Sequence, residues 1–188
     1  MLLAEAQALA ERVVDMLKPA CLKIEIAGSV RRRKPVVGDI EIVALPIVEV
    51  QPDMFGASDT VASKLEYLIG ELLENGNLVL DKVIRRNGEK YKRFREAGIA
   101  IDLFIADPGN YGNILAIRTG DSSFSKALVT GRRDGGLMPT NLKQRDGYLW
   151  RGNERIDCSD EVTYFIRMDM GWIDPPMRTW PLCKVVYL

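Results

Sequence analysis

Two short apolar segments that contain isolated acidic residues constrain the fold of this chain more than any other feature. In residues 39–45, Asp39 and Glu41 alternate with isoleucines, so a strand places both carboxylates on one face. In residues 99–105, Asp102 stands alone in an otherwise apolar run. An unpaired ionised acid in such a strand is costly. We therefore expect neighbouring strands of one sheet, with the three acids gathered around a cation.

The rest of the chain predicts an α/β or α+β fold, with a mixed sheet of about four or five strands flanked by helices. Asn87-Gly88 indicates a hairpin between two strands. Ser58 or Asp59 is expected to cap the helix predicted over 60–74. Helices are predicted over 2–18, 60–74, 109–118, 123–133 and 159–168, strands over 21–27, 39–45, 78–85, 90–96 and 99–105, a loop over 46–57 and a hairpin within 136–157.

The residue types that the chain lacks exclude several kinds of enzyme. Its 188 residues contain no histidine, which excludes histidine-dependent hydrolases and histidine-ligated zinc. Three cysteines are an odd number without metal-like spacing and indicate incidental thiols in a reducing compartment. The formal net charge is +0, so local clusters rather than the overall charge must indicate a nucleic-acid partner.

No segment predicts membrane insertion or secretion. No apolar run approaches the ~20 residues that a membrane helix requires, and the charges of Glu5, Glu11 and Arg12 interrupt the apolar N-terminus, unlike a secretory signal. We therefore expect no membrane partner and an intracellular, cytoplasmic location. The length suits one compact unit or two small lobes, and a change of character near residue 118 predicts lobes over 1–118 and 119–188.

A glycine-serine pair and a basic run precede the acidic strand. Gly28-Ser29 can bring backbone N–H groups to a phosphate, with the serine hydroxyl as an extra donor. Arg31 and Arg32 add forked cationic donors for the same anion. Magnesium prefers oxygen ligands and leaves room for substrate phosphates. Carboxylates for a metal beside donors for a phosphate are what phosphoryl transfer requires.

This pattern resembles the palm and thumb of the family X DNA polymerases, the group that includes DNA polymerase beta and small viral repair-type enzymes. The resemblance covers roughly residues 20–180. It rests on the following segments: Gly28-Ser29 with Arg31-Arg32, Asp39-Ile40-Glu41, Asp102, Arg118-Thr119-Gly120-Asp121, Gly152-Asn153-Glu154-Arg155-Ile156, and Gly171-Trp172-Ile173-Asp174-Pro175-Pro176-Met177-Arg178.

The resemblance implies a nucleotidyltransferase palm over 1–118 and a small thumb-like lobe over 119–188, and we expect neither a lyase nor a fingers domain. It implies that Asp39, Glu41 and Asp102 bind two Mg²⁺ ions, which Mn²⁺ can replace. The implied reaction transfers dNMP from a dNTP to a primer 3′-hydroxyl in gapped or primer-template DNA, and we expect a monomer.

The resemblance also implies the binding residues. The nucleotide would be bound by Gly28, Ser29, Arg32, Gly38, Arg118, Thr119 and Gly120, and DNA by Arg85, Arg93, Ser125, Lys126, Arg132 and Arg133. Trp150, Trp172 and Trp180 are interpreted as core or lobe anchors rather than base-stacking platforms.

Several positions depart from the family pattern. Ala100 stands where many members have an arginine near the primer end, and Ile117 and Arg118 replace an aromatic pair beside the sugar. Ser125 and Val129 replace common contacts to the minor groove and template, so we expect modest fidelity.

The expected function is that of a template-directed, gap-filling DNA polymerase. Three alternatives stay open: template-independent tailing, a non-catalytic DNA-binding module, and nucleotidylation of a protein, a tRNA or a small molecule. The polymerase interpretation requires Asp102 to lie beside Asp39 and Glu41 and not in a dry ion pair with an arginine.

Overall fold

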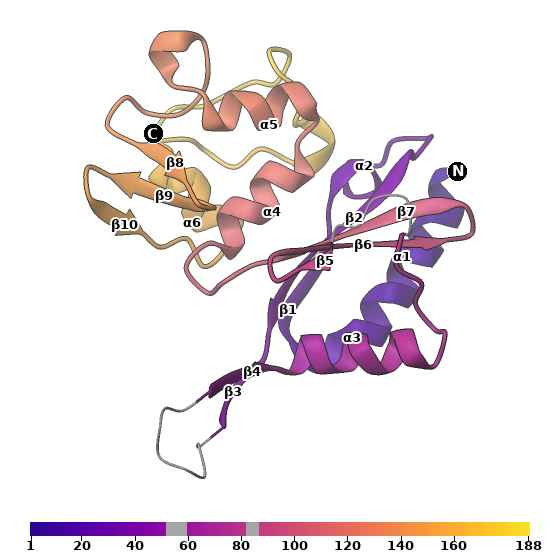
Figure 1. Ribbon diagram of the computed structural model, residues 1–188. Coiled ribbons are helices and arrows are strands. Elements are labelled where there is room, and N and C mark those ends of the chain that lie inside the picture. Colours follow the sequence, from indigo (N-terminus) through magenta and orange to yellow (C-terminus); the bar gives the residue numbers. More distant parts are fainter. Residues whose placement is uncertain (52–59, 82–86) are drawn as a thin grey trace.

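The computed structural model describes residues 1–51, 60–81 and 87–188, and over these ranges it has a mixed α+β fold (Figure 1). Its main sheet has five strands in the order β1-β2-β7-β6-β5. Their bounds are β1 Cys21–Ile26, β2 Asp39–Pro46, β5 Asn87–Gly88, β6 Tyr91–Glu96 and β7 Ile99–Ile105. β2 and β7 are parallel and the other pairs are antiparallel, so the sheet is mixed as predicted.

Helices cover one face of this sheet because the strands alternate. Ile40, Ile42 and Ile101 point into a core that they share with α1 (Leu3–Leu17) and α3 (Lys64–Glu74). The residues between them in sequence, including the predicted acids, therefore point to the other face. Over the described ranges, none of the helices has both the length and the apolar character needed to cross a bilayer.

The segment between β2 and α3 differs from the expected loop and helix start. Val48–Gln51 (β3) pairs with Thr60–Ser63 (β4) as a two-stranded hairpin. Ser63 caps α3, and its side chain accepts a hydrogen bond from the Glu66 backbone N–H at 3.3 Å. The predicted caps, Ser58 and Asp59, lie outside the described residues.

The predicted hairpin at Asn87-Gly88 is displaced by two residues. These two residues form β5, and the turn consists of Glu89 and Lys90. A second two-residue turn, Ala97-Gly98, joins β6 to β7, and both of its residues have positive φ angles of 48° and 79°. This is the backbone that a tight hairpin with twisted strands requires. Of the predicted strand 78–85, the described part makes one isolated bridge to β6.

The second lobe contains three helices around a small sheet. The bounds of its elements are α4 Tyr111–Thr119, α5 Ser122–Val129, β8 Lys143–Arg145, β9 Tyr148–Arg151, β10 Glu154–Ile156 and α6 Glu161–Arg167. The sheet has three strands, in the order β10-β9-β8, where one hairpin was predicted. The predicted helix 123–133 ends at Val129 and is followed by a short 3-10 helix. Trp172 and Trp180 pack against this lobe's apolar residues, whereas Trp150 faces outward.

Helix α4 connects the two lobes. Tyr111 and Leu115 pack against Val43 and Phe104 of the main sheet, while Ala116 belongs to the core of the second lobe. The predicted lobe boundary after residue 118 therefore falls in the last turn of a helix that both cores share.

Candidate active site

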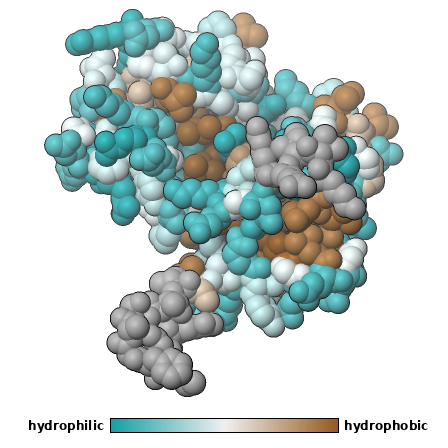
Figure 2. Space-filling model, viewed as in Figure 1, coloured by the Kyte–Doolittle hydropathy of each residue, from teal (hydrophilic) through white to brown (hydrophobic). Residues whose placement is uncertain are grey.

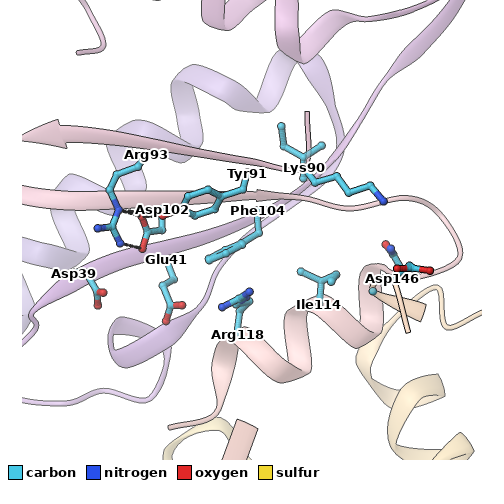
Figure 3. Close-up of a pocket in the computed structure, with 13 residues that line it drawn as sticks. Asp39, Glu41, Lys90, Tyr91, Arg93, Asp102, Phe104, Ile114, Arg118 and Asp146 are labelled. Carbon is cyan, nitrogen blue, oxygen red and sulfur yellow. Dashed lines mark hydrogen bonds and ion pairs between the residues drawn. The ribbon is translucent and has the colours of Figure 1, made fainter. Parts of the chain in front are cut away.

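The three predicted acids share the face of the main sheet that points toward the second lobe. In the parallel pairing of β2 with β7, Glu41 lies opposite Asp102 and Asp39 lies opposite Ala100. All three carboxylates line one pocket of about 730 Å³ (Figure 3). The sequence expectation that they converge from adjacent strands agrees with this register.

Asp102 is held by an arginine from the third strand. Its Oδ1 and Oδ2 accept hydrogen bonds from Nε and Nη2 of Arg93 at 2.5 and 2.6 Å (Figure 3). The hydroxyl of Tyr91 donates to Oδ1 at 2.7 Å. The side chains of Arg93 and Asp102 are 19% and 7% exposed. Arg93 was predicted to contact DNA and instead neutralises Asp102, because the antiparallel register of β6 and β7 places them opposite each other.

The sequence interpretation required that Asp102 not lie in a dry ion pair with an arginine. This pair lines the 730 Å³ pocket and its arginine side chain is 19% exposed, so the pair is not dry. A carboxylate offers about four lone-pair positions, of which Arg93 and Tyr91 occupy three. One position on Oδ2 is left for a further donor or a cation. Among the described residues, no three His, Cys, Asp or Glu side chains gather as a group that could hold a metal ion. The three acids thus share a pocket without forming a ready coordination sphere.

Asp39 and Glu41 lie beyond the Arg93–Asp102 pair and are half-buried. Burial, followed by the charge of the neighbouring Asp39, raises the pKa of Glu41 to about 7, against a smaller opposing effect of Arg118 and Arg32. Two adjacent carboxylates repel each other unless one is protonated or a cation lies between them. Their oxygen atoms are the ligands that Mg²⁺ prefers, so this pair fits a divalent cation.

A second pocket, of about 260 Å³, adjoins the acids and is lined by predicted nucleotide-binding residues. It contains Ser29, Arg32, Asp39, Glu41, Ile117, Arg118, Gly120, Asp121, Ser122 and Ser125. The Ser29 Oγ and the Arg32 Nε are buried and have no hydrogen-bond partner among the described residues. Buried polar groups in native structures are paired with protein groups, ordered water or ligands. Both groups can donate, so the oxygen atoms of a phosphate can pair with them.

Gly28 is required where the chain passes the acids. Its φ is +61°, and a Cβ atom there would collide with the Glu41 carboxylate. The segment that follows is a short helix, α2 (Gly28–Arg31), rather than the predicted turn. Gly38 lines neither pocket, and a Cβ at this position would meet open space.

The basic residues after Gly28 connect the lobes. Arg32 Nη1 donates to the carbonyl oxygens of Thr119 and Gly120 at 2.7 and 2.8 Å. Arg31 donates to Thr119 Oγ1 at 2.8 Å and to Glu161 at 2.7 Å. Arg31 is therefore engaged in contacts between the lobes, whereas the Arg32 Nε, at the smaller pocket, has no partner among the described residues.

Arg118 lines both pockets from the end of α4 (Figure 3). Its guanidinium lies 3.9 Å from the centre of the Phe104 ring, a cation–π contact that holds the charge near Glu41. Of the predicted nucleotide-binding residues, Ser29, Arg32, Arg118 and Gly120 line the smaller pocket. Gly28, Gly38 and Thr119 do not line it, and the Thr119 hydroxyl accepts a hydrogen bond from Arg31.

Two of the predicted DNA-binding residues make hydrogen bonds within the protein. Ser125 donates to the Ile117 carbonyl oxygen at 2.5 Å. Arg132 donates to the carbonyl oxygens of Leu137 and Met168 at 3.2 and 2.8 Å. Each side chain satisfies a backbone group that packing would otherwise leave unpaired, and contact of both residues with DNA stays a prediction. Lys126 and Arg133 are exposed, and Arg85 lies outside the described residues.

Sequence reasoning missed Tyr91 and the pairing of Arg93 with Asp102. The signal was present in the turn at Ala97-Gly98. Counting outward from a two-residue turn in an antiparallel hairpin puts Arg93 opposite Asp102 and Tyr91 opposite Phe104, which is the observed register. The sequence prediction placed a hairpin turn at Asn87-Gly88 and did not count the register from Ala97-Gly98.

The chain is a mixed α+β protein in which acids on adjacent strands of the main sheet face a pocket. A comparison with protein-family models finds no match to the chain. A comparison with curated proteins finds none either.

Proposed function

We propose that this protein is a divalent-metal-dependent nucleotidyltransferase that adds a deoxynucleotide to a DNA 3′-hydroxyl. The observation that supports this most is a pair of buried groups, Ser29 Oγ and Arg32 Nε, that have no partner among the described residues and lie at a pocket lined also by Asp39 and Glu41. Donors for phosphate oxygens beside acids for a cation are the parts that phosphoryl transfer uses.

The residues have distinct roles in this proposal. Ser29 and Arg32 donate hydrogen bonds to the outer phosphates of the nucleotide, and Asp39 and Glu41 would hold Mg²⁺. When bound, the metal would neutralise charge on the phosphates. Asp102, oriented by Arg93, offers its remaining Oδ2 acceptor position on the side of the primer.

The reaction forms one bond and breaks another. The 3′-oxygen bonds to the α-phosphorus, the bond from that phosphorus to the bridging oxygen breaks, and pyrophosphate leaves. The hydroxyl proton passes to a carboxylate of the site. Arg118, stacked on Phe104, adds positive charge where the leaving group develops negative charge.

The DNA-directed, gap-filling form of this activity rests on the resemblance to family X polymerases. Its test is extension of a gapped primer with dNTPs and Mg²⁺, followed on a denaturing gel. We expect Asp39→Asn to lower the rate at least about 100-fold, because it removes a ligand of the cation. Asp15→Asn, the same change on the exposed face of α1, is the matched control. Full activity in Asp39→Asn would show that the site is assigned wrongly.

One observation favours a second candidate, template-independent tailing. Ser125 and Arg132 already make hydrogen bonds within the protein, which leaves fewer of their donors for duplex DNA. A single-stranded primer offered without template distinguishes the two activities. Extension of that primer at the rate seen on gapped DNA would favour tailing.

A further inference from the structure

The small sheet of the second lobe has one buried and one outer face. Leu149 and Ile156 are buried in the lobe's core. Because side chains alternate along a strand, Tyr148 and Trp150 of β9 point to the outer face. Both side chains are partly buried, and neither belongs to the core of the lobe.

Basic residues surround these two rings. Lys143 and Arg155 lie opposite Trp150 on the neighbouring strands, and Arg145 lies opposite Tyr148. The Arg145 guanidinium lies 3.9 Å from the centre of the Trp150 ring, and that of Arg155 lies 4.6 Å from the centre of the Tyr148 ring. We call these five residues the cation–aromatic face. In Figure 2 the surface in the region of β9 and β10 is predominantly hydrophilic.

Acidic neighbours hold parts of this face in place without covering it. The Asp146 Oδ2 lies 3.9 Å from the Arg145 Nε, and the Asp157 Oδ1 lies 3.3 Å from the Arg155 Nε. The Tyr148 hydroxyl donates to Asp107 at 2.5 Å. The two arginine side chains are 59% and 49% exposed. Exposed ion pairs of this kind contribute little, so the guanidinium groups can bind another anion at small cost.

The cation–aromatic face continues from the candidate active site. The turn between β8 and β9, Asp146-Gly147, lines the 730 Å³ pocket together with Lys90. Both lie at the end of the pocket away from Asp39 (Figure 3). Asn113 of α4 donates to the Gly147 carbonyl oxygen at 3.3 Å and anchors the turn. Arg145 and Tyr148, the two residues that flank this turn, belong to the cation–aromatic face.

We propose that the cation–aromatic face binds a single-stranded stretch of DNA, namely the template strand beyond the active-site pocket. Unpaired bases stack on aromatic rings and on guanidinium planes, and cations contact the phosphates. Lys143, Arg145 and Arg155 match a polyanion in charge, and Tyr148 and Trp150 provide flat surfaces for bases. The identity of the strand as template rests on the proposed function, whereas the binding of single-stranded DNA does not.

The test measures binding without catalysis. A fluorescein-labelled oligo(dT) of about 16 nucleotides, long enough for one small site, is titrated with the full chain in EDTA, and its anisotropy is recorded. We expect Trp150→Ala and Arg145→Ala each to weaken binding at least about fivefold, since loss of one stacked base costs this much or more. Trp150→Phe, which keeps a ring, should retain most of the affinity.

Two further variants of this sheet sharpen the test. Arg151→Ala removes the same charge from the next residue of β9, which alternation places on the opposite side, and should change affinity less than about twofold. Asp146→Asn keeps a residue type that tolerates the positive φ of 54° and removes a neutralising charge, so it should tighten binding. The salt dependence of log Kd should fall by about 0.7 in slope for each lost phosphate contact.

Defined results overturn the proposal. If oligo(dT) does not bind, or binds Trp150→Ala and Arg145→Ala as it binds the wild type, the face has another occupant. If Arg151→Ala loses as much affinity as Arg145→Ala, the attraction is unspecific. Primer extension on a template with a single-nucleotide overhang separates this inference from the proposed function, because it needs the acids and not the outer face. If the wild-type protein binds oligo(dT) but does not extend the primer on this template, the proposed function alone is overturned.

Discussion

At the scale of single residues, the site depends on the close approach of the Gly28 backbone to the Glu41 carboxylate. Gly28 is the clearest case because two separate effects require glycine there. Its φ of +61° disfavours any side chain, and a Cβ would collide with Glu41. Gly76 has a similar φ of +72° but open space around a Cβ.

These two glycines make a matched pair for substitution. Alanine at either position costs about 1 kcal/mol from the left-handed backbone. We expect only Gly28→Ala to displace Glu41 as well and to lower the rate of primer extension at least about tenfold. Urea denaturation and extension assays on both variants check this. Equal rates in the two variants would contradict a role for close packing at Gly28.

The protonation of Glu41 is also a matter of its immediate surroundings. Its pKa is raised from 4.5 to about 7 by burial and by Asp39. Between these values the folded state binds more protons than the unfolded state, so the free energy of unfolding falls as pH rises through this window. At about 1.4 kcal/mol per pKa unit, the free energy of unfolding of the metal-free protein should fall by roughly 3 kcal/mol across this window.

Urea denaturation in EDTA from about pH 4.5 to about pH 8 measures this loss. Glu41→Gln, which has no titrating carboxyl, should show a flatter dependence over the same range. Identical pH profiles for the two proteins would mean that Glu41 titrates normally in the folded state. Added Mg²⁺ should raise the stability of the wild type most at the upper end of the range, where Glu41 is ionised.

At the scale of elements, a buried charge cluster joins α2 to α6 and the C-terminal segment. The Glu161 side chain is 4% exposed and accepts hydrogen bonds from Arg178 at 2.5 Å and Arg31 at 2.7 Å. Arg178 is fully buried and stacks near Phe165 and Trp172. The carboxylate is thus the shared partner of two guanidinium groups from different lobes.

Removal of this carboxylate should destabilise the chain strongly. Glu161→Ala leaves the buried Arg178 charge without its acid, a change that costs about 3–5 kcal/mol. Glu154→Ala, on an exposed residue of the same lobe, should cost less than about 0.5 kcal/mol. Chemical denaturation of both variants compares them. A loss in Glu161→Ala no larger than in this control would mean that the cluster does not stabilise the fold.

At the scale of the whole molecule, the two pockets share Asp39, Glu41 and Arg118, and the β8–β9 turn lies between the larger pocket and the cation–aromatic face. The smaller pocket lies between α2 and the start of α5, and the larger one extends along the acidic face of the main sheet. The chain's net charge is zero, so attraction of an anionic strand must come from the local arrangement of cations.

The sequence by itself determined the elements whose signal is local. Helix α1, strands β1, β2 and β7, and the common face of Asp39 and Glu41 follow from apolar spacing, because the periods of helices and strands decide which side chains point together. The position of Asp102 beside them followed from the cost of a lone acid in an apolar strand.

The tertiary structure decided which partner each polar group finds. Arg93 is bound to Asp102, and Arg132 to the Leu137 and Met168 carbonyl oxygens, although both looked like free cations in the sequence. Trp150 looked like a core residue and lies on an outer face. Periodicity assigns a face to a side chain, but only the packing of distant segments determines which buried donors and acceptors must be satisfied there.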